Sequence, residues 1–233
     1  MKTSTKNQKE ANFEHETYFH VYNSGVDGRI LFNSKEDFDR FEAYLYLLNA
    51  VEGQRAANFF TGNRAATIFE SARGELLVSI AAYAVTPREY HLLISANAHA
   101  GISKFMQKLQ TAYTMFFNKK YQRAGRLFQS SYRSKSAQST EHLKYLFAYV
   151  HLHPASIFDA GIVTGNVEPT EMPSLVAKAL HYRYSSVNEY TNGHVITKPD
   201  AFPPYLQRMK DGATLLRAFQ TFQSNQIKNR TKS

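Results

Sequence analysis

Two strand-like runs that lie three residues apart constrain the fold of this 233-residue chain more than any other feature. The first run, residues 76–85, is mostly apolar and long enough for a central strand. Pro87 interrupts the pattern, and the second run, residues 89–95, follows directly. A connection this short predicts that the two runs pair as neighbours in one sheet.

The segments around this pair change repeatedly between strand-like and helical periodicity. In chain order, we expect a strand at 18–22, a helix that begins at Ser34, loops over 50–74, a helix at 102–117, a final strand at 128–133 and a helix at 140–152 that Pro154 stops. This order predicts an α+β fold, an antiparallel sheet with helices packed on it that resembles a ferredoxin-like core.

The distribution of proline indicates where the folded core ends. Five of the seven prolines fall between residues 169 and 204, so we place a boundary near residue 160. The prediction is a polar N-terminal tail at 1–16, a domain at 17–160 and a C-terminal extension at 161–233. The extension is expected to be partly packed, with a basic and flexible end.

Positive charge is concentrated in one stretch of the chain. The chain has 28 Lys and Arg against 19 Asp and Glu, a net charge of +9. Residues 90–140 contain no acidic residue but eight Lys and Arg, whereas charge that served only solubility would be scattered. A one-sided basic block indicates a polyanionic partner.

Composition also excludes several classes of protein. There is no cysteine, which removes disulfide frameworks, thiolate zinc sites and cysteine nucleophiles. No run of 18 apolar residues exists, and the N-terminal residues lack an apolar signal-peptide core. We therefore expect no association with membranes and a cytoplasmic location.

Two short pairs of residues carry groups capable of metal or phosphate chemistry. Glu89 and His91 alternate along a strand and therefore share one face, where a carboxylate and an imidazole can hold a divalent cation. Tyr149 and His153 are one helical turn apart. Taken alone, the first pair is more typical of a solvated strand face, and Tyr149 of a helix-edge aromatic.

Six sequence blocks in collinear order, spanning roughly residues 17–190, resemble one family. They are Tyr-Phe-His-Val-Tyr-Asn-Ser-Gly-Val at 18–26, Thr-Pro-Arg-Glu-Tyr-His-Leu-Leu-Ile at 86–94, Gly-Ile-Ser-Lys-Phe-Met-Gln at 101–107, Gly-Arg-Leu-Phe-Gln at 125–129, Tyr-Val-His-Leu-His-Pro at 149–154 and Tyr-Ser-Ser-Val-Asn-Glu-Tyr at 184–190. The family is the REP-associated tyrosine transposases, within the single-tyrosine HUH transposases of the insertion-sequence 200/605 type.

The resemblance implies a ferredoxin-like, single-stranded DNA endonuclease and strand transferase. In that family a tyrosine attacks a phosphodiester and forms a 5′-phosphotyrosine, assisted by Mg²⁺ or Mn²⁺. The matching nucleophile is Tyr149, and the matching metal positions are Glu89, His91 and His153. The implied partner is single-stranded, hairpin-containing DNA, the implied location is the nucleoid, and the implied state is a monomer or homodimer.

Two positions depart from the family pattern. Glu89 stands where the family has a histidine, and His153 stands where it has Gln or Asn. Together the changes leave two imidazoles and one carboxylate. We therefore predict a compensated site, in which His153 makes up for the histidine missing at position 89, and a preference for Mn²⁺ over Mg²⁺. Two alternatives stay open: a domesticated, catalytically weak DNA- or RNA-binding protein on the same fold, and an unrelated metal hydrolase.

The basic block supplies the predicted DNA-binding residues. They are Lys104, Lys108, Lys119, Lys120, Arg123, Arg126 and Arg133, with Tyr121, Phe128 and Tyr132 interleaved as stacking surfaces. For Lys104 and Lys108 the alternative is that they form the solvated side of the helix at 102–117.

Overall fold

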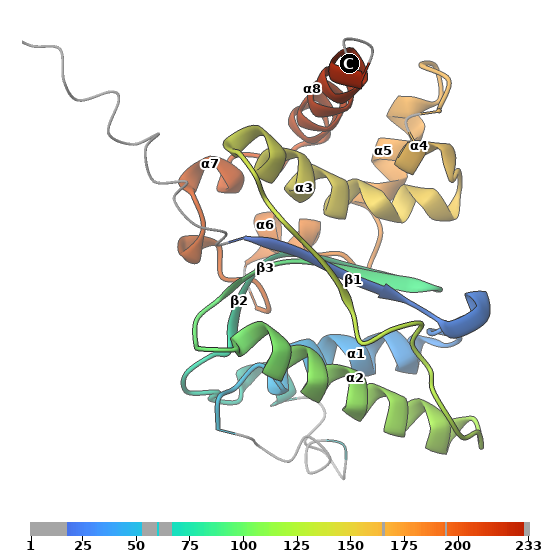
Figure 1. The fold of residues 1–233 in the computed structure, drawn as a ribbon, viewed down its shortest axis with the longest axis vertical. Helices are drawn as coiled ribbons and strands as arrows, with labels where there is room; N and C mark the ends of the chain where they lie inside the picture. The colour runs from blue at the N-terminus through green and yellow to red at the C-terminus, as the bar shows by residue number, and fades with distance from the viewer. Residues whose placement is uncertain (1–17, 53–59, 61–66, 165, 194, 231–233) are drawn as a thin grey trace, which may run out of the picture.

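A four-stranded antiparallel sheet organises the described part of the chain, which is residues 18–52, 60, 67–164, 166–193 and 195–230 of a computed structural model (Figure 1). Its strands are β1 (Phe19–Ser24), β2 (Val78–Thr86), β3 (Glu89–Ala96) and β4 (Arg133–Ser136), in the order β2-β3-β1-β4. β2 and β3 pair antiparallel across a tight connection, as predicted. The predicted tail at 1–16 and most of the predicted loops at 50–74 lie outside the described residues.

Two helices complete the βαββαβ order of a ferredoxin-like core. α1 (Lys35–Leu47) follows β1, and α2 (Gly101–Lys120) connects β3 to β4. Ser34 begins α1 through a capping box with Asp37, because each side chain bonds a backbone N–H that the first turn leaves free. Figure 1 shows α1 and α2 together on one side of the sheet, with α3 (Thr140–Leu152) on the other. The predicted α+β class is confirmed.

The last strand is not where the sequence placed it. The prediction of a strand at 128–133 is wrong, because β4 begins at Arg133 and the preceding segment bends across the sheet edge. Phe128 forms only an isolated bridge with Gly25 and is buried in the core, so it offers no stacking surface. The Asn23 side chain donates hydrogen bonds to the carbonyls of Ser130 and Ser131, which holds that segment in its bent course.

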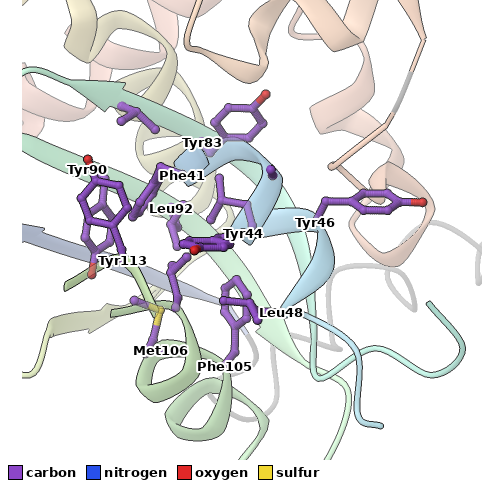
Figure 2. Close-up of a cluster of buried hydrophobic side chains, with 14 of the residues drawn as sticks. Phe41, Tyr44, Tyr46, Leu48, Tyr83, Tyr90, Leu92, Phe105, Met106 and Tyr113 are labelled. Carbon is purple, nitrogen blue, oxygen red and sulfur yellow. The ribbon is translucent and has the colours of Figure 1, made fainter. Parts of the chain in front are cut away.

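The two faces of the sheet bury different side chains. Tyr90, Leu92 and Ile94 of β3 face α1 and α2, where they join an aromatic-rich core (Figure 2). Leu93 and the small residues of β2 face α3 instead. This alternation is the period of two that a strand imposes, and it places His91 on the α3 face, opposite to Tyr90 and Leu92.

The C-terminal residues cover the outer layer and one sheet edge. They form α4 (Gly161–Thr164), α5 (Met172–Leu180), α6 (Glu189–Asn192), α7 (Pro204–Gln207) and α8 (Gly212–Arg230), with short 3-10 turns between them. The edge of β2 is covered by two backbone bonds, from Val85 N–H to the Tyr184 carbonyl and from Lys198 N–H to the Ile80 carbonyl. α8 packs along α3 (Figure 1). A domain boundary near residue 160 stays a prediction.

A buried carboxyl group on α1 makes the fold sensitive to pH. Glu42 accepts a hydrogen bond from the Tyr83 hydroxyl at 3.1 Å and lies 3.5 Å from the Arg183 guanidinium. Burial raises the pKa of Glu42 from 4.5 to about 7, although Arg183 favours the ionised form. Because the folded chain then binds this proton more tightly than the unfolded chain, stability falls as the pH rises from about 4.5 to 7.

Glu42→Gln is therefore expected to stabilise the protein by about 2 to 3 kcal/mol more at pH 8 than at pH 5. The substitution keeps an acceptor for Tyr83 but removes the carboxyl group, which loses its proton in a buried position as the pH rises. Urea unfolding of both proteins at the two pH values measures this difference. Parallel pH profiles for wild type and variant would contradict the assignment of Glu42.

Within the described residues, no helix combines the length and the apolar character that crossing a membrane requires.

Candidate metal and tyrosine site

The C-terminal end of α3 carries Tyr149 and is followed directly by His153. Ser139 caps the start of α3 by accepting a hydrogen bond from the backbone N–H of His142 at 3.1 Å. Pro154 follows in a 3-10 turn (His153–Ile157) that ends the helix at Leu152, as predicted. On its sheet-facing side α3 packs on β2 and β3, where Ala82 and Ala84 leave room for close approach. The end of α3 therefore meets the start of β3.

Glu89, His91 and His153 meet at this point. One oxygen of Glu89 lies 3.5 Å from Nε2 of His91, and the other lies 3.2 Å from Nε2 of His153. The two imidazole rings are 3.9 Å apart between centroids. One ligand atom from each residue lies within 4.8 Å of the others, a spacing suited to a single ion. The three positions that the family resemblance matched to metal ligands are therefore neighbours in the structure.

The state of these groups fits a divalent cation. Nε2 of His91 and Nδ1 of His153 are buried and have no hydrogen-bond partner among the described residues. Burial and the neighbouring His153 lower the pKa of His91 to about 4, so its ring is neutral at pH 7 and its lone pair is free to ligate. Burial acts to raise the pKa of Glu89, but its close contacts with the two imidazoles hold it below its usual value. Two imidazoles and a carboxylate form a donor set for a first-row divalent ion.

His20, which the sequence did not single out, supports the site from β1. Its Nε2 lies 2.9 Å from Nδ1 of His91, and both rings are buried. If Nδ1 of His91 donates this bond, Nε2 of His91 keeps a lone pair directed at Glu89 and His153. A partner of this kind fixes the tautomer and orientation of a ligating histidine.

His20→Phe is expected to weaken Mn²⁺ binding about 10- to 100-fold while leaving the fold intact. Phenylalanine keeps the ring that stacks on Tyr22 at 4.8 Å but cannot accept the bond from His91. Titration calorimetry with MnCl₂ measures the change, and His20→Gln, which retains an acceptor, should recover part of the affinity. Unchanged affinity in His20→Phe would show that His20 does not orient His91.

The Tyr149 ring packs against the same group. Its centroid lies 5.4 Å from that of His20, 5.6 Å from that of His91 and 5.5 Å from that of His153. The side chain is half-buried, and no described residue forms a hydrogen bond with its hydroxyl. Burial, then the nearby Tyr145 and Glu89, raises the pKa of Tyr149 above its usual value. The hydroxyl is thus protonated, on a ring that packs against the candidate metal group.

The predicted DNA-binding residues lie mainly on the other side of the sheet. Lys104, Lys108, Lys119 and Lys120 are on α2, which Figure 1 places opposite α3. Two of them have partners within the chain: Lys108 donates to the Ala50 carbonyl, and Lys120 forms ion pairs with Glu36 and Asp37 at 2.8 and 2.7 Å.

The other three occupy the path from α2 to the sheet. Arg123 donates to the Asn118 side chain and to the Arg126 carbonyl, Arg126 is exposed, and Arg133 begins β4. The structure does not bring these residues together with the four on α2 into one surface around Tyr149. Their contact with DNA stays a prediction.

The central part of the chain is similar to a known family. Residues 54–153 match the model of a family described as "Transposase IS200 like". We call these residues, which are similar to that family, the IS200-like segment. The IS200-like segment contains Glu89, His91, Tyr149 and His153, whereas His20 lies before it. The match confirms the resemblance identified from the sequence blocks.

One solved structure is also similar in fold. It is a REP-associated tyrosine transposase bound to a REP hairpin, with 10% sequence identity and a TM-score of 0.47, over 78% of this chain and 85% of that chain. None of the curated proteins compared with the chain matches it.

Proposed function

We propose that the chain is a metal-dependent enzyme that nicks and rejoins single-stranded DNA, with Tyr149 as its nucleophile. The observation that carries the proposal is the packing of the Tyr149 ring against His91 and His153, two members of the candidate metal group, inside the IS200-like segment. Hairpin-forming DNA is the substrate class that the sequence resemblance implies.

The bond changes in the proposed reaction balance without an external energy source. The Tyr149 oxygen attacks phosphorus and forms a phosphotyrosine bond, while the bond from phosphorus to the 3′ oxygen breaks. The phenol loses its proton, and the departing 3′ oxygen gains one. The 5′ phosphate stays on the protein, so attack by a 3′ hydroxyl in the reverse direction rejoins DNA.

Glu89, His91 and His153 would hold a divalent cation, with Mn²⁺ or Mg²⁺ as the candidates. When bound, such an ion polarises the phosphate and offsets the negative charge of the transition state. The chain itself orients the reactants: β3 and the end of α3 hold the ligands, and α3 holds Tyr149 beside them. The Glu89 charge that raises the pKa of Tyr149 is also the charge that a cation would neutralise.

The arrangement supports the use of Tyr149 within its own subunit. The tyrosine and the three candidate ligands come from one chain and are already adjacent. Neither a second copy nor a swapped helix is needed to bring them together. We therefore propose that one chain contains a complete site, in a monomer or in each half of a homodimer.

Incubation with end-labelled, hairpin-bearing single-stranded DNA tests the function. In MnCl₂ or MgCl₂ we expect a protein–DNA adduct that resists denaturant and that EDTA prevents. Binding without an adduct would favour the DNA- or RNA-binding alternative, which Glu89 in place of histidine would explain. Metal-dependent cleavage that survives loss of Tyr149 would favour an unrelated hydrolase.

A further inference from the structure

The edge strand β4 places two positive charges on the same face of the sheet as the candidate site. In the pairing of β1 with β4, Tyr22 is opposite Arg133 and His20 is opposite Lys135. Directly opposed residues of an antiparallel pair project to the same face. Because His20 contacts His91 and Tyr22 stacks on it, that face is the one that carries the metal group. Ser134 pairs with Val21 and projects to the other face.

Both charges are free to meet a ligand. Arg133 and Lys135 are exposed, and no described carboxylate forms an ion pair with either. Among the strands, α3 packs on β2 and β3 more than on β4. Burial and then the Lys135 charge lower the pKa of His142, which lies in the first turn of α3. Lys120 differs from both residues, because it forms ion pairs with Glu36 and Asp37.

The spacing of the pair matches an extended polyanion. Residues two apart on a strand are separated by about 7 Å, close to the separation of neighbouring phosphates in an extended single strand of nucleic acid. A positive groove beside an aromatic ring is the usual arrangement for single-strand binding. Half-exposed Tyr22 lies between Arg133 and His91, because it pairs with both across the sheet.

We propose that Arg133 and Lys135, the β4 strip, bind consecutive phosphates of the single-stranded DNA next to the phosphate that Tyr149 attacks. The inference rests on the proposed function and adds the path of the strand: it crosses the open edge of the sheet rather than the outer face of α2. Lys135 is therefore a substrate-binding residue that sequence reasoning left out of its DNA-binding set.

The salt dependence of DNA binding tests whether the β4 strip contacts phosphates, and it does not require the protein to cleave DNA. The probe is fluorescein-labelled oligodeoxythymidylate, bound in the Tyr149→Phe background at several concentrations of NaCl. Each phosphate contact on single-stranded nucleic acid contributes about 0.7 to the slope of log K against log salt. We expect Lys135→Gln to reduce the slope by about 0.7 and the double variant Arg133→Gln/Lys135→Gln by about 1.4.

Lys198→Gln is the matched control, because Lys198 is an exposed lysine beside β2, at the opposite edge of the sheet. Its slope should equal that of the parent. Slopes for the β4 variants that equal the control slope would overturn the proposed role of the β4 strip in DNA binding, even if wild-type protein forms the DNA adduct. Reduced slopes in a protein that forms no adduct would support phosphate binding by the β4 strip and overturn the proposed enzymatic activity.

Discussion

The Tyr149→Phe protein is expected to form no covalent adduct with single-stranded DNA, a loss of at least about 1,000-fold in rate. Phenylalanine keeps the ring that packs near His20, His91 and His153. Only the hydroxyl is removed, and no described residue bonds to it, so the fold and the affinity for DNA should be unchanged. Gel electrophoresis under denaturing conditions measures the adduct, and fluorescence anisotropy measures binding.

Tyr145→Phe provides a matched control on the same helix. Tyr145 lies one turn before Tyr149, is also half-buried and packs on Phe219 and Phe222 at 5.4 and 4.5 Å between ring centroids. Its hydroxyl is not assigned a role in the reaction, so this variant should retain the adduct. An adduct that persists in Tyr149→Phe, or that disappears equally in both variants, would contradict the assignment of the nucleophile.

His91→Ala is expected to weaken Mn²⁺ binding by about 100-fold or more, the second large effect. His91 is the central member of the candidate metal group, because it contacts Glu89, His153 and His20 at once. Calorimetry with MnCl₂ on folded protein measures the affinity. His181→Ala removes an exposed histidine at the end of α5 and should leave binding unchanged. Equal affinities for the two variants would place the ion elsewhere.

His153 decides whether the site is compensated. Imidazole is a softer ligand than an amide oxygen, so wild-type protein should bind Mn²⁺ more tightly than Mg²⁺, and His153→Ala should lose most of this preference. The buried, unpartnered Nδ1 of His153 and the 3.2 Å contact of Nε2 of the same ring with Glu89 motivate the expectation. A preference that is the same in both proteins would show that His153 does not ligate.

Local sequence patterns were sufficient for the elements that hold the site. Helical spacing and Pro154 fixed both ends of α3, and the short connection at Pro87 fixed the pairing of β2 with β3. The strand period then placed Glu89 and His91 on one face. These are short-range properties, which periodicity and turn residues report directly.

Features that depend on strand order were not predictable in this way. The contact between His20 and His91 exists because β1 lies beside β3, and nothing in the sequence around residue 20 reports that neighbour. β4 was misplaced because an exposed edge strand lacks the apolar alternation that marks a buried one. Lys120 was predicted to bind DNA because its ion pair with Asp37 could not be foreseen. That pair depends on how α1 packs against α2.

Mapping the covalent bond tests the account most directly. Wild-type protein is incubated with hairpin-bearing single-stranded DNA and MnCl₂, the DNA is digested with nuclease, and the peptides are sequenced by mass spectrometry. The account predicts a nucleotide 5′-phosphate on Tyr149 and a free 3′ hydroxyl on the released strand. A nucleotide on any other residue, or a cleaved strand with no modified peptide, would contradict it.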